Sequence, residues 1–147
     1  YDRDLLSTVA RTMIDLERKR ALIVHGENGM DEISPLCRTM TCMVAGSDIE
    51  ESCIVPDELG IYGCTVEALQ GGDLNTNVRI IRDVLAGCAG PYRDAVLLNA
   101  GAALMTAGKA MDLQEGMMLA GESIDSGRAQ SVLKSMVSYS RDRVMTC

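Results

Sequence analysis

A chain of 147 residues is long enough for one domain with a hydrophobic core and too short for two such domains. Hydrophobic residues make up 47% of it and charged residues 24%, a balance that excludes a disordered protein. The formal net charge of −7 argues against a general nucleic-acid binder, because no basic stripe is present to neutralise phosphates. No apolar run is long enough to cross a membrane and no signal peptide opens the sequence, so we expect a cytoplasmic protein.

The first predicted element is an amphipathic helix that leads directly into a strand. Asp2 can cap the N-terminus of a helix, and apolar residues then recur at helical spacing up to an end near Arg20. These apolar positions are Leu5, Leu6, Val9, Met13 and Leu16. Residues 21–24 form an unbroken apolar run, which predicts a short strand buried on both faces. Such a pair is half of an α/β unit.

A hairpin is predicted after the loop that follows this strand. Pro35 disfavours a helix there. Residues 38–44 and 49–55 have the composition of strands, and the sequence Ala-Gly-Ser-Asp at 45–48 between them is typical of a turn. Residues 56–60 are expected to form a turn or a single helical turn.

Two helices are predicted next. Two glycines followed by Asp73 break the chain before a helix that closes at Gly87. Its apolar face carries Val78, Ile81 and Leu85. Pro91 suits the first position of the following helix. The run 95–107 is rich in alanine, leucine and glycine on every side, which predicts a helix buried in the middle of the domain.

The chain is expected to end in two more helices. Asp112 and Glu115 have the spacing of a capping box, and Gly127 ends the helix that they begin. The apolar stripe of that helix consists of Leu113, Met117, Ala120 and Ile124. The stripe of the final helix consists of Ala129, Val132, Leu133, Met136 and Val137.

These elements predict an α/β fold in which helices pack on a mixed β-sheet. The sequence offers four strands or fewer, whereas a complete sheet has about five or six. The first residue is Tyr1 and not methionine. We therefore expect residues 1–147 to form a single unit that belongs to a longer protein, with an incomplete sheet.

The cysteines do not form a recognisable metal or disulfide framework. They are Cys37, Cys42, Cys53, Cys64, Cys88 and Cys147. No C-x-x-C pair occurs among them, and the single histidine, His25, cannot complete a zinc finger. We expect reduced thiols that are mostly buried and pack as small apolar side chains.

The loop after the first strand contains the candidate site. Asp31 and Glu32 stand side by side a few residues past the strand end, where α/β sheets bind ligands. Two neighbouring carboxylates suit Mg²⁺, which takes one or two of them together with waters and substrate phosphates. The alternative is that both acids merely cap the turn that follows. His25 can orient a carboxylate or transfer a proton there, although a histidine at a strand end more often satisfies backbone groups.

Four segments resemble, in order and spacing, the C-terminal part of the anthranilate phosphoribosyltransferase family. They are ALIVHGENGMDEIS (21–34), GGDLNTNVRIIRDVLAG (71–87), RDAVLLNAGAALMTAGKAMDLQEG (93–116) and SIDSG (123–127). The similarity runs from Tyr1 to about Leu133. Pyrimidine and thymidine phosphorylases are more distant relatives of this family.

The resemblance implies a phosphoribosyltransferase α/β domain and a step of tryptophan biosynthesis. The amine of anthranilate attacks the anomeric carbon of phosphoribosyl pyrophosphate, and pyrophosphate leaves. Mg²⁺ stabilises the negative charge that grows on the leaving group. The family's Asp-Glu pair holds this metal, which implies that Asp31 and Glu32 do so here.

Other parts of the family pattern are absent from this sequence. These are the glycine-rich GTGGD loop that cradles pyrophosphate, the KHGNR segment and the arginine that positions anthranilate. The N-terminal helical domain through which the family forms homodimers is absent too. Where the family reads Glu-Asn-Ala, this chain has Thr-Asn-Val at 76–78, so only Asn77 matches. We assign no catalytic residue within the chain, and we expect the isolated chain to be inactive because positioning of both substrates supplies most of the acceleration.

Two alternatives remain at this point. A nucleoside phosphorylase would use phosphate as the nucleophile and would not need the Asp-Glu pair. A non-catalytic partner module could keep the fold and lose the chemistry. Retention of two adjacent charges argues against an idle loop, because neighbouring carboxylates repel each other.

Overall fold

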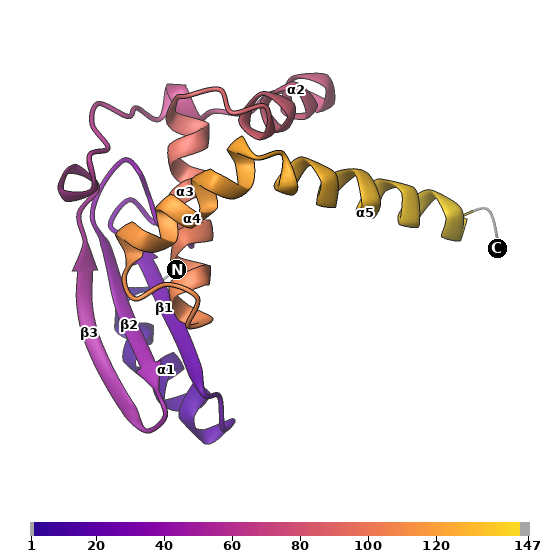
Figure 1. Cartoon of the computed structure of the whole chain (residues 1–147). Helices are drawn as coiled ribbons and strands as arrows, with labels where there is room; N and C mark the ends of the chain where they lie inside the picture. The colour runs from indigo at the N-terminus through magenta and orange to yellow at the C-terminus, as the bar shows by residue number, and fades with distance from the viewer. Residues whose placement is uncertain (1, 145–147) are drawn as a thin grey trace.

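The computed structural model describes residues 2–144. The elements in chain order are η1 (Arg3–Leu5), α1 (Leu6–Asp15), β1 (Arg20–Gly26), β2 (Thr39–Ala45), β3 (Asp48–Ile54), η2 (Pro56–Leu59), η3 (Glu67–Leu69), α2 (Leu74–Leu85), α3 (Pro91–Thr106), α4 (Leu113–Asp125) and α5 (Arg128–Val144). Figure 1 shows the strands as one sheet, with α3 and α4 lying against it and α5 leading away from the body.

The sheet has three strands in the order β1-β2-β3, and both pairs are antiparallel. The expected α/β class is confirmed, while the expectation of a mixed sheet is wrong for the described residues. The hairpin is confirmed as well, since only Gly46 and Ser47 separate β2 from β3. Gly46 has a φ of +63°, which glycine adopts without a steric penalty and which a tight hairpin turn requires.

Helix α1 covers one face of the sheet. The apolar cluster between them is formed by Leu6, Ala10, Cys42 and Val44. Asp2 caps η1, as expected, by accepting a hydrogen bond of 3.0 Å from the backbone N–H of Asp4. The helix nevertheless ends at Asp15, earlier than predicted, because the chain turns at Glu17 with a φ of +54°. The remaining residues up to Arg20 lead into β1.

Helices α3 and α4 cover the other face. The cluster there is formed by Ile33, Ile61, Leu98 and Ala102. Leu98 is fully buried, and its burial contributes roughly 1.5–3 kcal/mol to stability. Strand β1 is thus covered on both faces, since Ala21 and Ile23 pack toward α1 while Leu22 and Val24 pack toward α3. It is only half-buried, however, because nothing among the described residues pairs with its outer edge.

Two glycines allow α3 and α4 to cross closely. A Cβ atom added to Gly101 of α3 would lie 2.6 Å from the backbone nitrogen of Met117 in α4. One added to Gly116 would collide with the carbonyl oxygen of Gly101. The backbones therefore meet at a distance that no larger residue permits.

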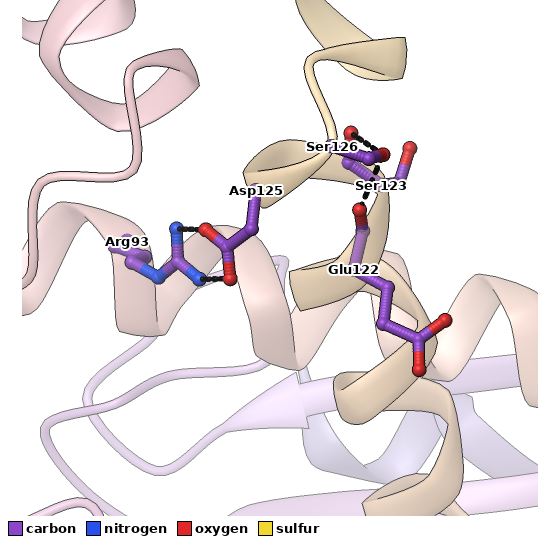
Figure 2. Close-up of polar contacts among 5 residues, drawn as sticks. All are labelled: Arg93, Glu122, Ser123, Asp125 and Ser126. Atoms are coloured by element: carbon purple, nitrogen blue, oxygen red, sulfur yellow. Dashed lines mark hydrogen bonds and ion pairs between the residues drawn. The ribbon is translucent and has the colours of Figure 1, made fainter.

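An ion pair joins the same two helices at their other end (Figure 2). The Arg93 guanidinium donates a hydrogen bond of 2.9 Å from Nη2 to Oδ2 of Asp125, and its Nη1 lies 2.9 Å from Oδ1. The Arg93 side chain is 13% exposed and that of Asp125 59%. Such a forked arrangement orients the two helices as well as holding them together.

The predicted helix boundaries are largely confirmed. Asp73 caps α2 by accepting a bond of 2.8 Å from the N–H of Thr76, and Gly87 follows its end with a φ of +89°. Asp112 caps α4 in the same way, with a bond of 2.8 Å from Glu115. Residues 56–59 form a short helical turn, as expected. The helix expected at Pro91 is also present and runs to Thr106.

Burial differs from expectation in three places. Helix α3 is buried at Leu98, Gly101 and Ala102 but exposes Val96 to 42%. The apolar stripe of α5 is present, yet Val132 is 60% and Met136 63% exposed, because α5 leaves the body instead of packing on it. Of the described cysteines, all reduced, Cys42 alone is buried and Cys88 is exposed; Cys147 lies outside the described residues.

Within residues 2–144 no helix is both long and apolar enough to span a lipid bilayer.

Candidate metal-binding loop

The candidate site is the loop that leaves β1 at Gly26. The loop folds on itself at once, because the N–H of Gly29 donates to the carbonyl of Gly26 over 2.8 Å. The N–H of Gly26 in turn donates to the carbonyl of Met30 over 2.9 Å. Gly29 has a φ of +84°, a conformation that larger residues rarely adopt. The two glycines therefore bring the following acids back beside the strand end.

Asp31 and Glu32 lie at the exposed tip of this loop, whereas the next two residues are buried. Ile33 is 1% exposed and Ser34 is fully buried. The chain thus passes from solvent into the core within one peptide bond. Both carboxylates therefore remain accessible to a ligand from solvent.

Asn99 of α3 anchors the loop directly after the acids. Its Oδ1 accepts a hydrogen bond of 2.9 Å from the N–H of Ile33, and its Nδ2 donates one of 2.9 Å to the carbonyl of Ile33. The same Nδ2 also donates to the carbonyl of Ala95 over 3.0 Å. One side chain therefore satisfies both polar groups of a buried peptide position and ties the loop to α3.

A second anchor lies one residue further on. The N–H of Ser34 donates to Oγ1 of the buried Thr39 over 3.0 Å. The Ser34 hydroxyl accepts bonds from the Asn28 amide at 3.4 Å and from the N–H of Leu36 at 3.1 Å. The loop conformation is thus fixed by hydrogen bonds from both of its sides.

The two acids influence each other's charge. Partial burial, hydrogen bonding to the Asp31 carboxyl and repulsion from its charge together raise the pKa of the Glu32 carboxyl above its ordinary value. A cation placed between the carboxylates would reverse the repulsion. A divalent ion bound between the two carboxylates would therefore be favoured by both charges.

The donor set fits a hard cation that needs few protein ligands. No group of three or more histidine, cysteine, aspartate or glutamate side chains suitable for a metal occurs within residues 2–144. This excludes a closed zinc-type cage among those residues. Mg²⁺, by contrast, commonly binds through one or two carboxylates and keeps several waters. His25 is half-buried on β1, opposite Met40 in the strand register, and its predicted role stays a prediction.

The glycine-rich break before α2 is a helix start. The Asn77 side chain accepts a bond of 2.9 Å from the N–H of Gly72 and donates one of 3.0 Å to its carbonyl. A Cβ atom on Gly71 would lie 2.8 Å from Oδ1 of Asn77. Asn77 therefore serves local packing of this turn.

Sequence reasoning did not identify Asn99 as part of the site. One signal was available, because Asn99 is the one amide in an otherwise apolar run of α3. A buried amide must find partners, but nothing in the sequence shows that those partners belong to residue 33.

The fold and the loop together define an α/β protein with two adjacent, exposed carboxylates on a loop that follows a strand. The chain matches the glycosyl transferase family, a/b domain, over residues 1–130. The chain therefore belongs to this family.

Individual relatives agree with that assignment. The chain is 49% identical over 146 residues to the anthranilate phosphoribosyltransferase of Syntrophomonas wolfei, covering 99% of this chain and 43% of the relative. The structure of the Thermus thermophilus anthranilate phosphoribosyltransferase superposes with a TM-score of 0.82 at 34% identity, over 96% of this chain and 41% of that one. A Saccharomyces cerevisiae anthranilate phosphoribosyltransferase in complex with PRPP and Mg shares the fold, with a TM-score of 0.81 at 24% identity over 91% and 39% of the two chains. The resemblance read from the sequence is confirmed, and the chain spans less than half the length of these relatives.

Proposed function

We propose that this chain is the Mg²⁺-binding part of an anthranilate phosphoribosyltransferase, which transfers the phosphoribosyl group of phosphoribosyl pyrophosphate to the amine of anthranilate. Relatives with this name match nearly the whole chain, at up to 49% identity among those described above. The chain itself is a single unit, the C-terminal part of the transferase domain.

The observation that carries the proposal is the exposed pair of Asp31 and Glu32 on a loop with a buried anchor. The yeast relative whose structure contains PRPP and Mg supports the choice of cation. Here Asp31 and Glu32 would hold Mg²⁺, and the ion would supply positive charge against the oxygens of the departing pyrophosphate. A nucleoside phosphorylase has no such need for the pair.

The chain's own residues keep that pair in place. Asn99 holds the backbone of Ile33, and the turn at Gly26 and Gly29 sets the direction from which the acids face solvent. Because the loop is preorganised, little conformational entropy is lost when a cation and its substrate bind.

Residues that bind the rest of the substrates come from elsewhere in the complete enzyme. The GTGGD and KHGNR motifs do not occur in the sequence of this chain. We therefore expect transfer only when the remaining part of the enzyme is supplied. We also propose that the complete protein is a cytoplasmic homodimer that joins through a helical domain outside this chain.

A chimeric enzyme tests this function. This chain replaces the matching segment of the Syntrophomonas wolfei relative, and loss of anthranilate fluorescence measures transfer in the presence of PRPP and Mg²⁺. We expect activity in the chimera and a loss of at least about 100-fold in the Asp31→Asn/Glu32→Gln variant, since charge stabilisation of this kind is worth several kcal/mol.

The chain offers a matched control for the charge change. Asp57 and Glu58 are also adjacent and exposed, but they lie on η2 and not on the loop. Asp57→Asn/Glu58→Gln removes the same formal charge and should leave activity unchanged. A folded chimera without activity, or equal activity in both double variants, would show that the proposed function is wrong.

A further inference from the structure

The loop that carries the two acids also contains an asparagine followed directly by a glycine. Asn28 precedes Gly29, whereas Asn75, Asn77 and Asn99 precede residues with a side chain. The main-chain nitrogen of the next residue can attack an asparagine amide, and glycine leaves that nitrogen unshielded because it has no Cβ atom. Asn28 and Gly29 are both exposed, so water reaches the pair.

The loop folds the Asn28 amide back over the peptide that would attack it. Its Oδ1 accepts a hydrogen bond of 3.3 Å from the N–H of Met30, two residues further on. The ring closed by this bond includes the nitrogen of Gly29, so the Cγ atom of Asn28 is held beside that nitrogen. The amide also packs against the turn, since a Cβ atom added to Gly26 would lie 2.8 Å from Oδ1.

The same contacts suit the chemistry of such an attack. The N–H of Met30 donates to the oxygen that becomes negative when a nucleophile adds to Cγ, as a donor of an oxyanion hole does. On the other side, Nδ2 of Asn28 lies 3.4 Å from the hydroxyl of Ser34. This hydroxyl both donates and accepts protons beside the nitrogen that has to leave as ammonia.

One contact restrains the reaction. The N–H of Gly29 donates to the carbonyl of Gly26 over 2.8 Å, so the attacking nitrogen is engaged while the turn is closed. It attacks only when this bond has opened and its proton has been lost. Residues 27–29 lie in the loop between β1 and β2, and an exposed loop opens at a lower cost than the whole fold. The reaction is therefore slow, and its rate rises with pH.

We propose that Asn28 is a site of self-modification, at which the loop converts its own amide into a carboxylate. The nitrogen of Gly29 forms a bond to Cγ of Asn28 and loses its proton, and the Cγ–Nδ2 bond breaks. Nδ2 leaves as ammonia with that proton. Water then opens the resulting five-membered imide at either carbonyl, which gives aspartate or isoaspartate without any oxidant or reductant. The inference is independent of the proposed function, because it involves only this loop and water.

Both products place a third carboxylate in the loop of Asp31 and Glu32, which increases the repulsion among its charges. Aspartate keeps the oxygen that accepts the bond from Met30, so the turn persists. Isoaspartate routes the main chain through the side chain and adds one methylene to it, which breaks the bond between Gly26 and Met30. Accumulation of isoaspartate therefore unfolds the turn that presents the two acids.

Ageing of the purified, folded chain tests the site. The chain is incubated in buffers of increasing pH, and peptide mapping by mass spectrometry measures the loss of each asparagine amide. We expect conversion of Asn28 to be at least about tenfold faster than that of Asn75, which is exposed but helical and precedes a threonine. Chromatography against synthetic peptides should identify isoaspartate at position 28, and the rate should rise with pH.

Two variants isolate the attack by the main chain. Gly29→Ala shields the nitrogen with a Cβ atom that meets nothing within 4 Å, although the φ of +84° strains it. Asn28→Gln keeps an amide but has to close a six-membered ring, which forms more slowly. We expect each variant to lower conversion at position 28 by at least about tenfold. Amide NMR spectra show whether each variant keeps the fold, and Asn28→Gln decides the question if Gly29→Ala does not.

Three outcomes would overturn the self-modification. The first is conversion of Asn28 that is no faster than that of Asn75. The second is conversion in Asn28→Gln at the rate of the unaltered chain. The third is aspartate as the sole product, which direct hydrolysis of the amide gives without an imide. Loss of transfer activity in the chimeric enzyme bears on the proposed function alone.

Discussion

Asn99 on α3 forms two hydrogen bonds of 2.9 Å with the backbone of Ile33, the residue that follows Asp31 and Glu32. These bonds connect the candidate metal site to the core, because Ile33 is buried against Leu98 of the same helix. The position of two exposed acids thus depends on one buried amide.

Replacement of Asn99 by leucine should therefore loosen the loop. Asn99→Leu leaves the N–H and carbonyl of the buried Ile33 without partners, at a cost of about 1–3 kcal/mol in the free energy of unfolding. Urea denaturation measures this cost, and calorimetry of the chimeric enzyme should show weaker Mg²⁺-dependent binding of PRPP. Asn75→Leu is the control, because Asn75 is exposed on α2. Equal stabilities of the two variants would contradict the anchoring role.

The ionisation of Glu32 should respond to Mg²⁺. Because its pKa is raised in the folded chain, the folded state binds more protons than the unfolded state between the ordinary pKa and the raised one. Stability from this group is accordingly greatest below the ordinary pKa and is lost as pH rises through that window. A bound cation favours the charged carboxylate and should lower the pKa.

Carbon-13 NMR of the Glu32 carboxyl, titrated with and without Mg²⁺ on the chimeric enzyme, measures this shift. Asp31→Asn should lower the pKa of Glu32 even without metal, since it removes the repelling charge. An identical titration curve with and without Mg²⁺ would show that the ion binds elsewhere.

The helix crossing should tolerate no side chain at Gly101. Gly101→Ala places a Cβ atom 2.6 Å from a backbone nitrogen of α4, which forces the helices apart and should cost about 1–3 kcal/mol. The contrast is Gly121→Ala on α4, where the new atom would find its nearest neighbour at 3.7 Å. That variant should be stabilised by about 0.5–1 kcal/mol through helix propensity. Thermal melts measure both effects. Melting temperatures that shift in the same direction in the two variants would contradict the close crossing.

The ion pair of Figure 2 should matter more than an ordinary surface pair. Asp125→Asn removes the charge that faces the largely buried Arg93 guanidinium, and we expect a loss of about 1–3 kcal/mol. Glu122→Gln, on the exposed side of the same helix, is the control and should change stability by less than about 0.5 kcal/mol. Denaturation at low and high salt measures the stability of both variants. If Asp125→Asn left stability unchanged, this ion pair would contribute no more than an ordinary exposed one.

Local signals predicted much of the fold. The caps at Asp2 and Asp112 formed where residue type and spacing placed them, because a cap needs only neighbours in sequence. The tight turn between β2 and β3 is of the same kind. Strand direction was not predictable in this way, and the sheet is antiparallel where a mixed one was expected. Pairing partners are chosen by contacts that are distant in sequence.

The sequence by itself determined most of the helix boundaries, the hairpin and the adjacent acids at 31–32, since each depends on residues a few positions apart. The tertiary structure alone decided that Asn99 holds residue 33, that Gly101 meets Gly116, and that β1 keeps a free edge among the described residues. Each of these depends on segments brought together from distant parts of the chain. A buried hydrogen bond or a close backbone contact has no local signal, because its partner is chosen only when the core packs.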